Sequence, residues 1–180
     1  MNIRNTNIPD VVIIEPRVFN DTRGYFFESY NKISFDELIG DDINFIQDNE
    51  AKSSYGVLRG LHFQKGQHAQ AKLIRVVSGK VLDVAVDIRK DSPTFGKYVS
   101  QILSEENKLQ LFIPHGFAHG YVALSKEVIF QYKCDNYYCP TSEAGIAFDD
   151  KELAIDWMIP REDMILSDKD LVYNCLAELI

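Results

Sequence analysis

The chain has 180 residues, of which 46% are hydrophobic and 26% charged, so it is long enough for one domain with a substantial core and short for two. Its 27 acidic residues outnumber its 19 basic ones, and the net charge of −8 argues against non-specific binding to DNA or to an anionic membrane surface. Three cysteines, Cys134, Cys139 and Cys175, form neither an even disulfide set nor a CxxC zinc pattern, which favours a reducing cytoplasm. The start of the chain has no apolar targeting region, and no apolar run approaches the roughly 20 residues of a membrane span. These features predict a soluble, cytoplasmic protein.

The first element that the pattern predicts is a short helix. Residues 34–37 read Ser-Phe-Asp-Glu, which has the form of a capping box ahead of Leu38 and Ile39. Gly40 follows and is a typical helix stop. Little further helix is predicted in the chain.

Short β-branched runs bounded by Gly, Pro, Asn and Ser recur along the chain. Strands are predicted at residues 73–77, 81–88, 97–103, 109–113 and 128–134. Gly79, between the first two, is expected in a hairpin turn because glycine tolerates a positive φ. Within 81–88, alternation separates two faces: Leu82, Val84, Val86 and Ile88 against Asp83, Ala85, Asp87 and Arg89. The pattern is typical of a mainly antiparallel barrel or sandwich.

His62 lies in the strand-like segment 57–64. Alternation places Gly60, His62 and Gln64 on one face of this strand, and Leu61 and Phe63 on the other. A glycine beside a histidine leaves space for a ligand. A half-buried histidine that is hydrogen-bonded for structural reasons is the competing interpretation, and His62 alone does not decide between them.

Three cations can each be interpreted either as ordinary surface charges or as functional groups. Lys72 starts an apolar strand, where a lysine usually extends its charge to solvent, but a fixed charge there could also stabilise an oxyanion in a water-poor site. Arg59 and Arg23 are either surface charges or ligands for phosphate oxygens, for which guanidinium is the best-shaped donor.

Tyr132 lies on the same strand face as Val128, Phe130 and Cys134. If this apolar face is the core, the phenol points inward and needs a polar partner. It is then either a core tyrosine bonded to a carbonyl or a proton donor across a cavity from His62.

The histidines do not form a complete metal motif. A metal-binding cupin pairs an H-x-H segment and a glutamate with a P-x-G-x-x-H segment. Residues 114–119 fit the second segment and end at His119, but the first reads His62-Phe63-Gln64, and glutamine is a poor ligand for a transition metal. No metal is therefore expected, and His68 and His115 are the remaining candidate ligands.

A series of motifs follows one another along nearly the whole chain: 16–19, 21–28, 47–49, 56–62, 70–79, 83–87, 92–96, 113–120, 132–134, 155–157 and 166–170. In this order they resemble the dTDP-4-dehydrorhamnose 3,5-epimerases, a family of metal-free cupin-type sugar-nucleotide enzymes. The resemblance implies a single cupin-like jelly-roll β-barrel domain over 1–180 with few short helices. It also implies a cytoplasmic homodimer that needs no cofactor.

The activity implied by the resemblance is epimerisation at C3 and C5 of dTDP-4-dehydro-6-deoxy-D-glucose to dTDP-4-dehydro-L-rhamnose, on the route to dTDP-L-rhamnose. His62 would be the base, Asp170 would orient it, Lys72 would face the enolate oxygen and Tyr132 would donate a proton to the opposite face. The matching substrate-binding positions are Arg23, Glu28, Gln47, Asn49, Arg59, His119 and Glu143, with Phe19, Phe26 and Tyr138 as flat apolar surfaces for the base or sugar.

Some assignments stay open. Residues 167–170 also have the form of a helix cap, and Asp168 could replace Asp170 as the orienting carboxylate, although Asp170 is preferred. His115 stands where many relatives have a glutamate, and residues 65–69 lack the proline often found there. The alternative functions are a C3-only epimerase, a sugar 3,4-ketoisomerase and a non-catalytic cupin that only binds a sugar nucleotide.

Overall fold

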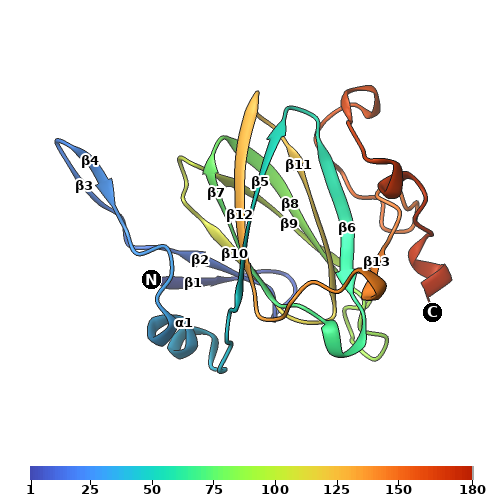
Figure 1. Ribbon diagram of the computed structural model, residues 1–180, viewed down its shortest axis with the longest axis horizontal. Coiled ribbons are helices and arrows are strands. Elements are labelled where there is room, and N and C mark those ends of the chain that lie inside the picture. Colours follow the sequence, from blue (N-terminus) through green and yellow to red (C-terminus); the bar gives the residue numbers. More distant parts are fainter. Residues whose placement is uncertain (180) are drawn as a thin grey trace.

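Two antiparallel β-sheets face each other in the computed structural model, which describes residues 1–179 (Figure 1). The six-stranded sheet has the order β1-β2-β10-β7-β12-β5 and the five-stranded sheet the order β13-β6-β11-β8-β9. The strands are β1 (Asn2–Asn5), β2 (Val12–Glu15), β3 (Phe19–Asp21), β4 (Gly24–Phe26), β5 (Gln47–Ser54), β6 (Leu58–Gln64), β7 (Lys72–Ser78), β8 (Lys80–Asp87), β9 (Tyr98–Ser104), β10 (Gln110–Ile113), β11 (Phe117–Ala123), β12 (Glu127–Cys134) and β13 (Glu143–Gly145). The prediction of a mainly β fold is confirmed, and each predicted strand is present with its ends within one residue of the expected position.

Helical structure is limited in the described residues. The α-helix α1 (Lys32–Ile39) is accompanied by short 3₁₀ turns: η1 (Gly66–His68), η2 (Pro140–Ser142), η3 (Arg161–Asp163), η4 (Asp168–Leu171) and η5 (Leu176–Leu179). Within residues 1–179, no helix has the length and apolarity that a membrane crossing requires.

The start of α1 differs from the prediction. Asn31, not Ser34, caps the helix, because the Asn31 side chain accepts a hydrogen bond from the Ser34 backbone N–H. The earlier start turns Phe35 into the core, where it is 1% exposed and packs edge-on against Phe112. The predicted stop is confirmed, since Gly40 has a left-handed φ of 76° and its N–H bonds to the Asp36 carbonyl.

The hairpin predicted at Gly79 is wrong. Gly79 has the expected positive φ of 81°, and a Cβ there would lie 2.1 Å from the Glu127 carbonyl oxygen. However, β7 pairs with β10 and β12 in the six-stranded sheet, whereas β8 pairs with β9 and β11 in the five-stranded sheet. The turn therefore carries the chain from one sheet to the other, and the two strands that flank it pair with other strands instead of with each other.

Strand β8 is buried on both faces. Ala85 belongs to the apolar cluster between the two sheets, together with Ile74 and Phe130. Leu82 and Val84 belong to a second cluster, which the C-terminal segment completes on the outside of the five-stranded sheet: Ile146, Phe148, Leu153, Trp157 and Leu176. In Figure 1 this segment lies outside the barrel, next to β6. The more polar face of β8 is consequently the inner one, which brings an acidic residue into the barrel.

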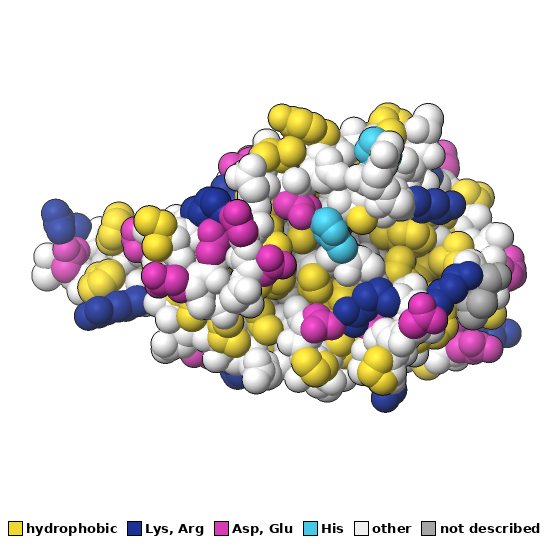
Figure 2. Space-filling model, turned by 90° about the horizontal axis from the view of Figure 1, so that it is seen from below, with side chains coloured by type: hydrophobic (Ala, Val, Ile, Leu, Met, Phe, Trp, Pro, Cys, Tyr) yellow, Lys and Arg dark blue, Asp and Glu magenta, His cyan; other side chains and the backbone are white. Residues whose placement is uncertain are grey.

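The ribbon formed by β3 and β4 projects away from the barrel (Figure 1). Phe19 and Phe26 face each other across it and are 50% and 67% exposed. Arg23 lies at its tip, paired with Asp21. In Figure 2 the ribbon is the narrow arm on the left, on which charged and apolar side chains are interspersed. Exposed apolar surface that is interspersed with charged residues often marks an interaction site.

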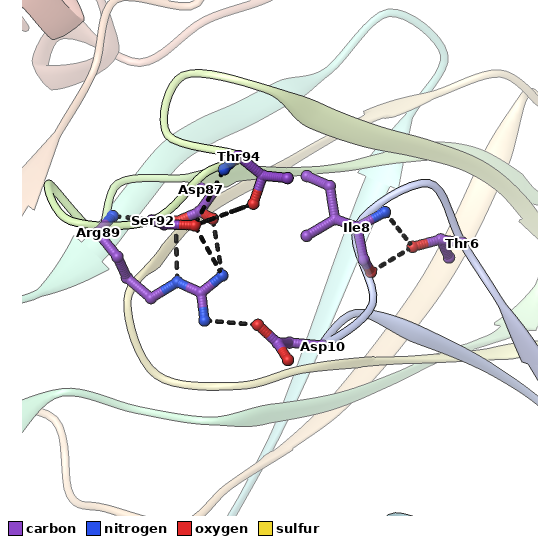
Figure 3. Close-up of polar contacts among 7 residues, drawn as sticks. All are labelled: Thr6, Ile8, Asp10, Asp87, Arg89, Ser92 and Thr94. Carbon is purple, nitrogen blue, oxygen red and sulfur yellow. Dashed lines mark hydrogen bonds and ion pairs between the residues drawn. The ribbon is translucent and has the colours of Figure 1, made fainter.

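A buried carboxylate organises one end of the barrel (Figure 3). Asp87, at the end of β8, is 0% exposed and accepts hydrogen bonds from Arg89 (2.7 and 2.9 Å), Ser92 (2.6 Å) and Thr94 (2.6 Å). Arg89 also donates a hydrogen bond to Asp10 at 2.6 Å, which connects the N-terminal segment to the loop after β8. Burial alone would raise the pKa of Asp87, but these donors hold it well below its ordinary value.

We therefore expect Asp87→Asn to lower the free energy of unfolding by about 3 kcal/mol at pH 7, since it removes a buried carboxylate charge from its ion pair with the partly exposed Arg89. A carboxylate whose pKa is lower in the folded than in the unfolded protein stabilises the fold at pH values above the ordinary Asp pKa. This contribution is lost as the pH falls towards the folded-state pKa. Urea unfolding should thus show the gap between wild type and variant shrinking from about pH 5 to about pH 2. The exposed Asp91→Asn is the control, and a gap independent of pH would contradict the prediction.

Candidate active site

A cavity of about 300 Å³ lies between the two sheets. Its walls are formed by Ala51, Arg59, His62, Lys72, His119, Tyr121, Phe130, Tyr132, Tyr138, Glu143, Ser167, Lys169 and Asp170. The structure thus brings all the predicted catalytic residues together. Of the predicted substrate-binding residues, it adds Arg59, His119, Tyr138 and Glu143.

The two walls of the cavity carry different chemistry. His62 on β6 and His119 on β11 are paired directly across the five-stranded sheet. Lys72, the first residue of β7, and Tyr132 on β12 belong to the neighbouring strands of the six-stranded sheet. A molecule held in the cavity would therefore have the histidines on one side and the lysine and tyrosine on the other.

A bulge in β6 aims His62 into the cavity. The β6–β11 register shifts between His119 and Tyr121, and Gly60 lies so close to Gly120 that a Cβ on Gly60 would be 2.5 Å from the Gly120 Cα. The irregularity interrupts the strict alternation that the sequence predicted. Leu58 and Leu61 both join the outer apolar cluster, while His62 lines the cavity.

His62 is held by a buried carboxylate. Its Nε2 lies 2.5 Å from Oδ1 of Asp170, which is 3% exposed, and Ser167 donates to the other carboxylate oxygen at 2.7 Å. Burial would raise the pKa of Asp170, but the hydrogen bonds from His62 and Ser167 lower it below the ordinary value. The carboxylate therefore stays ionised near neutral pH and can stabilise an imidazolium. Asp168, the other candidate, is exposed at the start of η4.

His119 has a carboxylate partner of its own. Its Nε2 lies 3.0 Å from both oxygens of Asp83, which is 0% exposed on the inner face of β8. Burial lowers the pKa of His119, although Asp83 acts in the opposite direction. A neutral His119 that donates Nε2–H to Asp83 keeps Nδ1 as an acceptor. Asp83 was not predicted as a site residue, and its only signals were its acidic side chain within an apolar strand and its place in the 83–87 motif.

Lys72 and Tyr132 lie together on the opposite wall. The Lys72 Nζ is 5.7 Å from the centre of the Tyr132 ring. Burial lowers the pKa of Lys72 and raises that of the Tyr132 phenol to about 12. The phenol therefore keeps its proton until a strong base forms nearby, and the ammonium acts in a medium that screens its charge weakly.

Glu143 links two elements at the rim of the cavity. Tyr138 donates its hydroxyl to one Glu143 oxygen at 2.8 Å, and Lys169 pairs with the other. Lys169 was not predicted as a site residue, although it lies inside the 166–170 motif. Arg59 lies further along the wall, where its Nε is 3.4 Å from the Ser53 hydroxyl.

The remaining predicted binding residues lie outside the cavity walls. Gln47 and Asn49 are on β5, the edge strand of the six-stranded sheet. Gln47 donates to Asn49 at 2.9 Å and accepts from the Tyr138 N–H at 3.2 Å. Glu28 accepts from Asn31 near the start of α1 at 3.2 Å. Three residues are on the projecting ribbon: Arg23, Phe19 and Phe26. The structure does not bring these three to the cavity of their own chain.

The candidate metal ligands are dispersed. Among residues 1–179, no three His, Cys, Asp or Glu side chains are placed to hold one ion. His115 pairs with Asp135 at 2.7 Å, and His68 lies in η1 beside Gln67. Gln64, at the position where a metal-binding cupin has histidine, accepts a structural hydrogen bond from the Cys139 N–H.

Sequence comparison relates this chain to one family of proteins. Residues 5–178 match the family model described as dTDP-4-dehydrorhamnose 3,5-epimerase. The chain belongs to this family. The enzyme of that name from Salmonella typhimurium is 58% identical over 157 residues, which cover 87% of this chain and 86% of the relative.

Solved structures of the family share the fold. That of the 3,5-epimerase from Elizabethkingia anophelis has a TM-score of 0.95 at 55% identity, covering 99% of this chain and 97% of that one. The 3,5-epimerase from Legionella pneumophila, in complex with dTDP-4-keto-L-rhamnose, has a TM-score of 0.95 at 50% identity, covering 99% and 96%. A 3'-monoepimerase from Streptomyces bikiniensis has a TM-score of 0.90 at 31% identity, covering 98% and 88%. The prediction of a cupin-type jelly roll is confirmed.

Proposed function

We propose that this chain carries out the reaction of its family, epimerisation at C3 and C5 of dTDP-4-dehydro-6-deoxy-D-glucose to dTDP-4-dehydro-L-rhamnose. The observation that supports it most is the placement of the His62–Asp170 pair and of Tyr132 on opposite walls of one cavity. Inversion of a carbon requires that a proton leave from one face and return to the other. A base and an acid on facing walls meet that requirement.

The chemistry follows from the C4 ketone. Its carbonyl acidifies the hydrogens on C3 and C5, so neutral His62 removes one of them and becomes an imidazolium that Asp170 stabilises. The electron pair of the broken C–H bond moves onto the C4 oxygen as an enolate, which the Lys72 ammonium stabilises. The enolate then collapses, and its carbon takes the phenolic proton of Tyr132 on the opposite face. His62 then releases its proton to water and the Tyr132 phenolate takes one up, which restores both groups, and the same cycle at the second carbon inverts it.

Three alternatives compete with this proposal. A C3-only epimerase would use the same groups with a different sugar pose, and the monoepimerase structure shows that the fold is compatible with it. The higher identity to 3,5-epimerases favours inversion at both carbons. A sugar 3,4-ketoisomerase would move the carbonyl to C3. A non-catalytic cupin would not need an acid and a base on opposite walls.

The test is proton NMR of the purified protein with the 4-keto sugar nucleotide in deuterated buffer, after treatment with a chelator. We expect loss of hydrogen at both C3 and C5 and formation of the L-configured ketosugar. Exchange at C3 alone would identify a monoepimerase, and a ketone moved to C3 a ketoisomerase. Binding without exchange would identify a non-catalytic module.

The chain is further proposed to act as a homodimer in which the ribbon of one subunit completes the cavity of the other. Phe19 and Phe26 expose large apolar rings on the ribbon, and the Arg23 side chain is 88% exposed. These residues can contact a substrate beside His62 only if a second subunit presents them. A guanidinium supplied in this way would bind the diphosphate.

Complementation tests this arrangement. Arg23→Ala and His62→Ala are each expected to be strongly impaired as homodimers. Co-expressed in equal amounts, they should recover about a quarter of wild-type activity, because half of the dimers are mixed and each mixed dimer has one intact site. Recovery would be absent if Arg23 served the site of its own subunit.

The proposed location is the cytoplasm. Cys134, Cys139 and Cys175 are all free thiols among the described residues, as is usual in a reducing compartment. Cys134 is buried and is the strand partner of Lys72, and burial raises the pKa of its thiol to about 11. Fractionation of the native host would check this proposal.

A further inference from the structure

Tyr173 contacts the proposed base from the C-terminal segment. The centres of the Tyr173 and His62 rings are 5.6 Å apart, and their planes meet at 68°, an edge-to-face arrangement. Tyr173 is half-buried and follows η4, the turn that carries Asp170. The same segment thus places both a carboxylate and an aromatic ring against His62.

The position of the Tyr173 ring depends on Gly145. Gly145 lies on β13 and is the direct strand partner of His62 on β6. A Cβ on Gly145 would lie 2.5 to 2.7 Å from three carbon atoms of the Tyr173 ring. Gly145 is not among the glycines with a positive φ, so its backbone conformation suits any residue. Glycine is therefore needed here because the Tyr173 ring occupies the place of a side chain, and not because of the backbone conformation.

Asp170 and Tyr173 both contact the His62 imidazole. Asp170 binds Nε2, the β13 backbone lies beside the strand, and the Tyr173 ring packs against the imidazole ring. Since Nε2 of His62 is hydrogen-bonded to Asp170, Nδ1 of His62 is the atom left to accept a proton. Burial and the nearby Glu143 and Asp170 raise the pKa of Tyr173 to about 12, so the packed ring stays neutral near pH 7.

We propose that Tyr173 is a positioning residue: seated on Gly145, its ring fixes the orientation of His62 and shields the His62–Asp170 hydrogen bond from water. The catalytic part of this inference rests on the proposed function, because it requires His62 to be the base. The orienting part does not, since it concerns the protein without substrate. A small rotation of a catalytic ring is enough to cost one or two orders of magnitude in rate.

The experiment compares Tyr173→Ala, Tyr173→Phe and Gly145→Ala with Val172→Ala as the matched control. Val172 precedes Tyr173 on the same segment, and its side chain points to solvent at 74% exposure. We expect Tyr173→Ala to lower kcat by about 10- to 100-fold with KM changed by less than about 3-fold. Tyr173→Phe should retain most of the rate because it keeps the ring. Gly145→Ala should reproduce the loss because the methyl group displaces the same ring.

The second readout is the His62 Nε2–H proton resonance in the free protein, assigned by its disappearance in His62→Gln. It should be visible in wild type, Tyr173→Phe and Val172→Ala, and be broadened by exchange with water in Tyr173→Ala and Gly145→Ala. An unchanged resonance and kcat in Tyr173→Ala would overturn the proposal, as would a rise in KM alone, which would indicate contact with substrate. If the resonance changes as expected but the wild-type protein has no epimerase activity, the proposed function is refuted and the positioning role of Tyr173 is still supported. If Tyr173→Ala does not fold, Gly145→Ala decides.

Discussion

His62→Ala is expected to abolish hydrogen exchange at both C3 and C5 and to lower kcat by about 10³-fold or more, because one imidazole serves as the base for both carbons. The Asp170 carboxylate loses its partner but remains bonded to Ser167, so the fold should persist. The measurement is deuterium incorporation by NMR, together with equilibrium binding of dTDP. Binding should be retained, since His62 is assigned to proton removal.

His115→Ala is the matched control for this variant. His115 is exposed, pairs with Asp135 and lies outside the cavity walls, so its loss should leave both exchange rates near wild type. Normal turnover in His62→Ala would remove His62 from the role of base. Exchange that survives at one carbon only would indicate a second base for that position.

Tyr132→Phe is expected to separate the two halves of the reaction. The ring and its contact with Lys72 are kept, but the proton donor is lost. Formation of the inverted product should fall by about 100-fold, whereas deuterium washout should fall much less, because His62 still removes and returns protons on its own face. Both quantities can be followed in one NMR time course.

Tyr137→Phe is the control for this substitution, since Tyr137 is 64% exposed and follows β12 closely in sequence. It should leave product formation and washout unchanged. An equal fall of the two rates in Tyr132→Phe would argue against a role restricted to protonation and for one in binding or orienting the sugar.

Local sequence pattern was sufficient for six of the thirteen described strands, β6 to β10 and β12, and for the end of α1. Alternation between apolar and polar residues, and the stop at Gly40, depend on neighbours in sequence, so they can be read without the fold. The orientation of Tyr132 could be predicted in the same way, because its strand face is uniformly apolar. The resemblance to a family then supplied roles for His62, Lys72 and Tyr132.

Only the tertiary structure decided which distant residues meet. His62 and Asp170 are 108 positions apart, and the choice of Asp170 over Asp168 follows from how η4 packs on β6. The inner position of Asp83 depends on the C-terminal segment covering the opposite face of β8. Such contacts arise when strands pair across sheets and segments pack on their faces, and no local pattern specifies them. The placement of Arg23 on a ribbon away from its own cavity, and of Tyr173 against His62, became visible for the same reason.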